Sequence, residues 1–269
     1  MLRIFTDTAA NVPPHLLEQY HITAMPLTYL LDGQPTELVG HDYYEAMRKG
    51  AEVKTSLVSP ALIRDTMESA LKDGDDVLYI AISGGISGTC WSAELMAEEL
   101  RGEYPDRMIR VLNTCGASLG EGLVVLEAAK MLEKGCTADE IIRQAEENCG
   151  RMRQFFMVDD LKYLRRGGRI SAAAQVAGSL LKIKPILQSD PEGHIIQHSK
   201  VRGQLKAMET LAELYKEYAV DGTRTVGIAH ADCPEEAACL ARLLQRNHPP
   251  RDILTVVYEP VTGSHVGPG

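Results

Sequence analysis

Short apolar runs alternate with amphipathic stretches along the chain, a pattern typical of α/β proteins. Leu2–Phe5 reads as a first strand, and the unbroken run Val77–Ile82 predicts a strand that is buried on both faces of a parallel sheet. Further strands are expected at the other apolar runs, over residues 25–31, 108–112, 155–158, 183–188, 194–200, 225–230 and 253–258. Helices are expected between them, beginning near residues 14, 41, 59, 89, 116, 137, 160, 171, 202 and 234.

Two segments carry strong signals for the first turn of a helix. Ser59 followed by Pro60 combines an N-cap hydroxyl with proline at the first helical position. Thr137 and Glu140 have the spacing of a capping box, in which each side chain accepts a hydrogen bond from the other residue's backbone N–H. Ser171 is also expected to cap a helix, SAAAQVAGSLL, whose small residues either pack closely or leave room for an apolar ligand.

The character of the chain changes after Arg153. Strands and helices alternate one by one before it, whereas the runs 183–188 and 194–200 read as a hairpin. We therefore expect an N-terminal α/β domain over residues 1–153 and a C-terminal α/β domain over 154–269. The chain has 269 residues, which is long enough for two such domains.

Composition and charge exclude several classes of function. Apolar residues make up 45% of the chain and the net charge is -9, so this is an ordinary globular composition that is poorly suited to nucleic acid. No segment approaches the roughly 20 apolar residues of a membrane span, and the first residues do not resemble a secretion signal. The six cysteines lack metal-ligand spacing, so we expect reduced thiols, no metal and a cytoplasmic location.

The glycine-rich loop Ser83–Thr89 follows the expected buried strand and opens a helix. Its backbone N–H groups and the hydroxyls of Ser87 and Thr89 suit an anionic group at the carboxyl end of a strand. The loop lacks the lysine of a nucleotide-binding loop, and Thr89 stands where a nucleophile elbow has its last glycine. A ligand-free turn, a phosphate-ligand binding module and a serine hydrolase using Ser87 remain open.

A few other polar residues could recognise a ligand. Thr55 and Ser56 precede the helix cap at Ser59 and have no capping duty of their own. Arg169 follows two glycines, and its planar guanidinium suits a carboxylate. By contrast, the neighbouring Lys162, Arg165 and Arg166 read as a solvated helix face. His265 lies in a glycine-rich tail and has no pattern that assigns it a role.

Taken in order, these segments resemble the DegV family. The matching segments are Phe5-Thr-Asp-Thr-Ala, Thr55-Ser-Leu-Val-Ser-Pro60, Ile82-Ser-Gly-Gly-Ile-Ser-Gly-Thr89, Leu161–Ile170, Leu180-Leu-Lys-Ile-Lys-Pro-Ile-Leu187, Arg202 and Ser264-His-Val-Gly-Pro-Gly269. Each segment is weak alone, but the ordered set is specific and spans nearly the whole chain. The sequence departs from the family at Gly84, where a second serine is usual, and at Leu57-Val58, where Gln-Pro is usual.

The resemblance implies a Rossmann-like N-terminal domain with carboxylate-binding loops and a C-terminal domain with a mixed sheet that contributes to an acyl tunnel. It implies one bound long-chain fatty acid and no other cofactor. Some members resemble the carrier subunit of a bacterial fatty-acid kinase, in which a separate subunit phosphorylates the acyl group. The residues implied near the carboxylate are Thr55, Ser87, Arg169 and His265, with Ser56, Ser83, Gly88 and Thr89 as secondary candidates. The residues implied at the kinase partner are Arg202, Arg165 and Arg166.

Simple energetics agree with this resemblance. Burying an acyl chain of about 16 carbons contributes roughly 0.8 kcal/mol per methylene, about 12 kcal/mol before the costs of association. The carboxylate then needs only satisfied hydrogen bonds, because an unpaired buried charge is expensive. The sequence offers no evident general base or metal ligand set beside the loop, so we expect a carrier rather than an enzyme.

Overall fold

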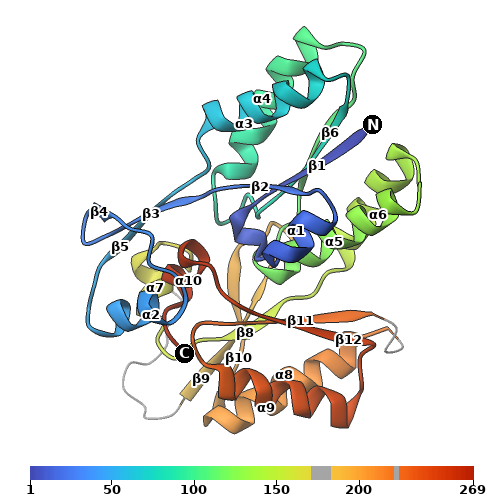
Figure 1. Cartoon of the computed structure of the whole chain (residues 1–269). Helices are drawn as coiled ribbons and strands as arrows, with labels where there is room; N and C mark the ends of the chain where they lie inside the picture. Colours follow the sequence, from blue (N-terminus) through green and yellow to red (C-terminus); the bar gives the residue numbers. More distant parts are fainter. Residues whose placement is uncertain (171–182, 221–223) are drawn as a thin grey trace. The chain divides into compact units, whose positions relative to one another are not determined.

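The computed structural model describes residues 1–170, 183–220 and 224–269 (Figure 1). They form two compact units: residues 1–28 with 55–152, and residues 29–54 with 153–269. Each unit contains both helices and strands, which confirms the α/β class predicted from the sequence. The expected helix of small residues beginning at Ser171 lies outside the described residues. No helix in the described ranges has the length and hydropathy needed to cross a membrane.

The first unit is built on a parallel four-stranded sheet of order β2-β1-β6-β7. Its strands are β1 (Leu2–Asp7), β2 (Thr23–Met25), β6 (Asp76–Ala81) and β7 (Ile109–Asn113). Residues 77–81 of β6 are fully buried, which confirms the sequence prediction of a strand covered on both faces. Because all four strands are parallel, the loops that follow β1, β6 and β7 meet at one edge of the sheet.

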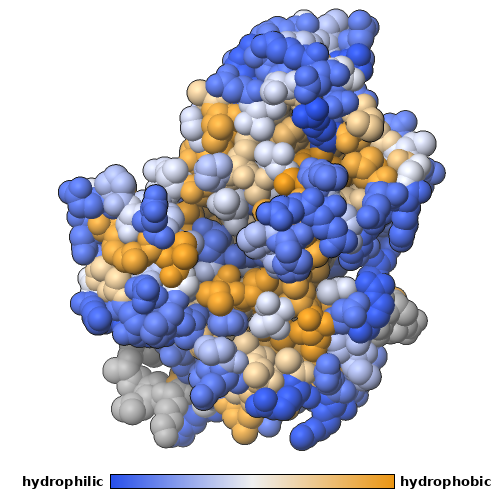
Figure 2. Space-filling model, viewed as in Figure 1, coloured by the Kyte–Doolittle hydropathy of each residue, from blue (hydrophilic) through white to orange (hydrophobic). Residues whose placement is uncertain are grey.

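Helices cover both faces of this sheet. They are the 3₁₀ helix η1 (Thr8–Ala10), α1 (Pro14–Gln19), α3 (Pro60–Lys72), α4 (Thr89–Glu103), α5 (Leu119–Glu133) and α6 (Ala138–Arg151). In Figure 1, α3 with α4 and α5 with α6 lie on opposite sides of β1 and β6. Figure 2 shows mainly hydrophilic residues over the outer face of α3 and α4, as expected where a helix meets solvent.

The two helix starts predicted from the sequence behave differently. Thr137 accepts a hydrogen bond from Glu140 N while Glu140 accepts one from Thr137 N, so the capping box is confirmed. Ser59 is the N-cap residue of α3, but its side chain makes no capping hydrogen bond. The expected role of its hydroxyl was therefore wrong, and Pro60 at the first helical position carries the start of α3.

The described residues of the C-terminal part of the second unit, from residue 153 onward, form two sheets. The antiparallel sheet has the order β10-β9-β8, with β8 (Phe155–Met157), β9 (Ile183–Ser189) and β10 (Ile195–Arg202). β9 and β10 form the predicted hairpin. The other sheet pairs β11 (Thr225–His230) and β12 (Asp252–Val257) in parallel. The helices are α7 (Lys162–Arg166), α8 (Gln204–Tyr218), α9 (Pro234–Asn247) and α10 (Pro260–Val266).

An early segment of the chain also belongs to this second unit. β3 (Thr28–Leu31), β4 (Gln34–Pro35) and β5 (Val53–Ser56) form a small sheet, and α2 (Gly40–Arg48) comes between β4 and β5 in the chain. Tyr43, Tyr44 and Met47 of α2 are buried in one apolar cluster with Ala231. The apolar run 25–31, expected as one strand, divides between β2 and β3 because the chain leaves one unit for the other there.

Candidate functional site

The loop after β6 is held tightly by backbone and side-chain hydrogen bonds. Ser83 is fully buried, and its N–H donates to Gly116 O at 2.8 Å. Gly84 N donates to Asn113 Oδ1 at 3.1 Å, so the ends of β6 and β7 are linked. The N–H of Ser87 turns back to Ser83 O at 3.0 Å. The loop is therefore a preformed turn that leads directly into α4.

Ser87 and Thr89 form a small hydroxyl pair where the loop meets α4. Ser87 Oγ donates to Thr89 Oγ1 at 3.0 Å and accepts from Thr89 N at 3.2 Å. Thr89 Oγ1 also accepts from Val58 N at 3.4 Å. A Cβ atom at Gly88 would lie 3.3 Å from Leu57 Cδ2, which shows that the Thr55–Pro60 segment borders this loop. Two segments that sequence reasoning selected separately thus meet in the first unit.

Asp7 anchors the same edge of the sheet and was missed as a functional residue. Its carboxylate is fully buried and accepts hydrogen bonds from Ala9 N at 3.1 Å and Ile82 N at 3.1 Å. Tyr79 donates to the same carboxylate from 3.4 Å. Asp7 therefore ties the end of β1 to the residue that enters the loop. The signal available in the sequence was an acidic residue at the end of the first strand.

Unusual backbone conformations gather beside these residues. Asn11, Cys115 and Ser118 all have positive φ values, 53°, 51° and 52°, although none is glycine. Ser118 Oγ donates to Asn11 Oδ1 at 3.0 Å, which links the loops after β1 and β7. Such conformations cost free energy and cluster where a structure serves a ligand. They mark the carboxyl edge of the first unit as its candidate binding site.

The second unit brings Arg169 and His265 together. Arg169 is half-buried, its Nη1 donates to Gly167 O at 2.5 Å, and burial lowers its pKa. Burial, together with the charge of Arg169, lowers the pKa of His265 to about 4. A Cβ atom at Gly167 would collide with His265 Nδ1, so only glycine permits this approach. The pair therefore presents one cation beside a neutral imidazole at neutral pH.

Helix α10, which carries His265, was not predicted, because the sequence analysis treated this segment only as a glycine-rich tail. Glu259 caps it by accepting hydrogen bonds from Val261 N at 2.6 Å and from the backbone and hydroxyl of Thr262. The hydroxyl of Tyr43, which lies 217 positions earlier in the chain, donates to Pro260 O at 2.8 Å. These contacts fix the direction of α10 and with it the position of His265.

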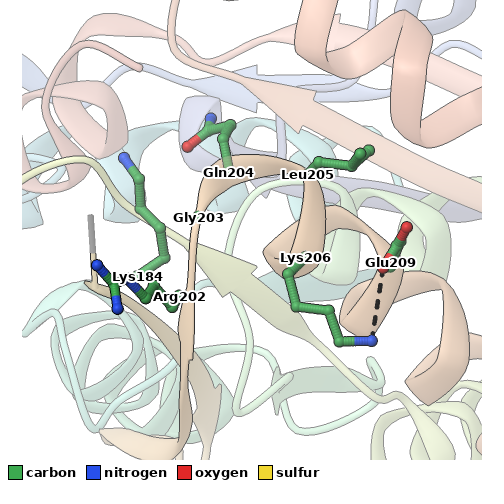
Figure 3. Close-up of a pocket in the computed structure, with 7 residues that line it drawn as sticks. All are labelled: Lys184, Arg202, Gly203, Gln204, Leu205, Lys206 and Glu209. Atoms are coloured by element: carbon green, nitrogen blue, oxygen red, sulfur yellow. Dashed lines mark ion pairs between the residues drawn. The ribbon is translucent and has the colours of Figure 1, made fainter.

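The three arginines that the family resemblance implies at a kinase partner lie on exposed parts of the second unit. Arg165 and Arg166 are exposed on α7, and Arg166 lies 5.6 Å from the centre of the Tyr163 ring. Arg202 lines an open hollow of about 800 Å³ at the start of α8, together with Lys184 and Lys206 (Figure 3). Lys184 and Lys206 are themselves paired with nearby carboxylates, so the hollow has little net positive charge.

The remaining predicted residues fall into two groups. Ser83 and Thr89 are buried in the first unit, and Ser56 and Gly88 are exposed at its edge. Thr55 is partly buried in β5. Thr55 and Ser87 belong to the first unit, whereas Arg169 and His265 belong to the second.

Two clusters of described residues in the second unit have the residue types of a metal site, and one of them is Asp190, Glu192 and His194 at the turn between β9 and β10. In the other, His41, Glu45 and Asp232 offer ligand atoms within 4.8 Å of one another. Arg48 Nη1, however, lies 2.5 Å from Asp232 Oδ2 and 2.8 Å from Glu45 Oε1. The guanidinium already supplies the positive charge that these carboxylates require, so the cluster is an ion-pair network that attaches α2.

Comparisons with known proteins agree on one family. A family model described as "Uncharacterised protein, DegV family" matches residues 1–269. A DegV domain-containing protein of Clostridium perfringens is 37% identical over 273 residues, which cover 99% of this chain and 94% of that protein.

Solved structures agree as well. A DegV family protein from Thermus thermophilus, reported for its fatty acid binding, has a TM-score of 0.89 at 29% identity, covering 100% of this chain and 96% of that one. DegV from Bacillus subtilis, described as a fatty acid binding protein, has a TM-score of 0.87 at 31% identity, with the same coverage.

Proposed function

The chain belongs to the DegV family, and on that premise we propose that it is a cytoplasmic carrier that binds one long-chain fatty acid and presents the carboxylate to a separate fatty-acid kinase. The observation that carries the proposal is the preformed loop Ser83–Gly88, which opens α4 with the Ser87–Thr89 hydroxyl pair at its end. Helix N-termini and hydroxyls stabilise a carboxylate without a metal.

The carboxylate is assigned to Thr55 and Ser87, with Ser56, Ser83, Gly88 and Thr89 as secondary contributors. Ser87 Oγ can exchange its bond to Thr89 for one to the ligand without leaving a buried group unpaired. Arg169 and His265 are assigned to the same head group. Arg169 supplies the charge, while the neutral imidazole of His265 donates or accepts a hydrogen bond.

In this proposal the N-terminal and C-terminal parts of the chain have different roles in binding the ligand. Residues 1–153 supply the carboxylate-binding loops, and residues 154–269 contribute to the acyl tunnel. Arg202, Arg165 and Arg166 are assigned to contacts with the kinase, since all three are exposed. The phosphoryl transfer then belongs to the kinase, which holds ATP, and this chain takes part only as a carrier.

A serine hydrolase that uses Ser87 is the main alternative. Within the described part of the chain, the hydrogen bonds of Ser87 Oγ go only to Thr89. A nucleophilic serine requires a base within hydrogen-bond reach. The contacts of Ser87 therefore favour a hydrogen-bonding role, and they favour the carrier over the hydrolase.

Extraction of the purified protein with organic solvent, followed by mass spectrometry, tests the ligand class directly. We expect a stoichiometric fatty acid. Thr55→Ala and Ser87→Ala should each weaken palmitate binding by about 1 kcal/mol or more, measured by calorimetry. Unchanged affinity in both variants and in the double variant would reject the head-group assignment. Labelling of Ser87 by a fluorophosphonate probe would instead support the hydrolase.

A further inference from the structure

The side chain of Trp91 lies on the loop Ser83–Gly88, although core packing does not account for its position. Trp91 is the chain's only tryptophan, it belongs to the first turn of α4, and it is 64% exposed. Its indole Nε1 donates a hydrogen bond to Gly84 O at 3.1 Å. Because an exposed ring buries little apolar surface, this hydrogen bond rather than burial holds the ring on the loop.

Gly84 is matched to this ring. A Cβ atom at Gly84 would lie 2.8 Å from Trp91 Nε1 and 3.0 Å from Trp91 Cε2, which is closer than van der Waals contact allows. The next atom, Asn113 Nδ2, would be 3.2 Å away. The φ angle of Gly84 lies outside the left-handed region, so its backbone conformation does not require glycine. The missing side chain at position 84 therefore makes room for the indole, and the two residues form a pair.

The two peptide groups on either side of Gly84 are hydrogen-bonded at both ends. In the first, Gly84 N donates to Asn113 Oδ1 at 3.1 Å, and Ser83 O accepts from Ser87 N at 3.0 Å. In the second, Gly85 N donates to Ser83 Oγ at 3.1 Å, and Gly84 O accepts from the indole. The indole bond comes from an exposed side chain, so it can be removed without opening the core of the unit.

We propose that Trp91 is a positioning residue for the carboxylate site, because its N–H fixes the Gly84–Gly85 peptide and with it the turn that carries Ser87. Three of the six residues in the loop are glycine, so the loop has many alternative conformations when this peptide can rotate. A loop that is ordered before the ligand arrives binds it more tightly, since less conformational entropy is lost on binding. This inference rests on the proposed function, to which it adds a residue that acts without touching the ligand.

Three substitutions at one position separate the hydrogen bond from the bulk of the ring, with palmitate affinity measured by calorimetry at about pH 8. Trp91→Phe keeps a large ring without an N–H, and its Kd should rise about three- to tenfold, the effect of one modest hydrogen bond. Trp91→His is smaller, but its Nε2–H takes the ring position of the indole N–H, so its Kd should stay within about twofold of the wild type. Trp91→Ala should resemble Trp91→Phe. Tighter binding by Trp91→Phe than by Trp91→His would mean that ring packing matters instead, and would overturn the proposal.

The pairing with Gly84 provides a second test. Gly84→Ala should raise the Kd for palmitate about as much as Trp91→Ala does, because the added methyl displaces the indole. In the Trp91→Ala background the same substitution should have a much smaller effect, since no ring is left to displace. Equal effects in the two backgrounds would overturn the pairing on which the proposal depends.

Stability and a neighbouring residue serve as controls. Because Trp91 is exposed, its three variants should unfold at the urea concentration of the wild type, and a loss of affinity that follows a loss of stability would count against the proposal. Leu95→Ala, one turn further along α4 at a side chain that is 56% exposed, should leave the Kd unchanged. If the wild type binds no long-chain fatty acid, the proposed function fails and this inference falls with it. If it binds palmitate and every Trp91 variant binds equally well, only the role of Trp91 is rejected.

Discussion

The clearest quantitative prediction concerns the pH dependence of stability that His265 imposes. Burial and the nearby Arg169 lower the pKa of His265 from 6.5 to about 4. Between these two values the unfolded chain binds a proton that the folded chain does not. The free energy of unfolding must therefore fall as the pH drops through this window. The contribution is fully present above the unfolded pKa and is lost on the acid side.

The size of the effect follows from the two pKa values. From about pH 7.5 to about pH 5.5, His265 alone should lower the free energy of unfolding by about 1.3 kcal/mol. The replacement His265→Gln removes the titration, so its stability should fall less over the same interval. Urea unfolding of both proteins at each pH gives the difference directly, because all other titrating groups are common to both.

A matched control and a clear refutation are available. His15→Gln makes the same replacement at an exposed histidine and serves as the control for the substitution itself. If wild type and His265→Gln lose the same stability to within about 0.4 kcal/mol, the imidazole is not held in the buried site described above. Repeating the series with palmitate bound tests the head-group assignment, since a carboxylate beside His265 should raise its pKa and reduce the loss.

Two further pairs of variants test the loop and the helix starts. Gly84→Ala should push the indole of Trp91 off the loop and red-shift its fluorescence, whereas Gly102→Ala, where an added methyl meets nothing, should leave the emission unchanged. A wild-type spectrum for Gly84→Ala would contradict the packing of Trp91 on the loop. Thr137→Ala should cost about 1 kcal/mol in urea unfolding, while Ser59→Ala should change stability by less than about 0.5 kcal/mol. Equal losses would mean that Ser59 caps its helix after all.

Local signals predicted most of the secondary structure correctly. The apolar run Val77–Ile82 predicted a strand whose side chains are buried on both faces of a sheet. The structure shows this strand as β6, and its residues are buried. The Thr137–Glu140 spacing defined a capping box because both hydrogen bonds lie within one helical turn. The glycine-rich loop and the Thr55–Pro60 segment were both recognised as candidate ligand segments from residue type alone.

Contacts between distant residues were beyond these signals. α10 contains Gly263, which argues against a helix, but Glu259 caps it and Tyr43 donates to Pro260 O in its first turn. Tyr44 donates to Tyr258 O just before the helix begins. Asp7 gained its importance only when β1 was placed beside β6.

The sequence by itself therefore determined the α/β class, the order of most elements and the segments that could bind an anion, since these depend on neighbours within a few positions. The tertiary structure alone decided which of those segments meet, which unit residues 29–54 join, and that His265 is buried beside Arg169. The physical reason is that periodicity and capping are encoded over one or two turns. Burial, pKa shifts and shared hydrogen bonds arise instead between side chains that the chain separates by up to 217 positions, as for Tyr43 and Pro260.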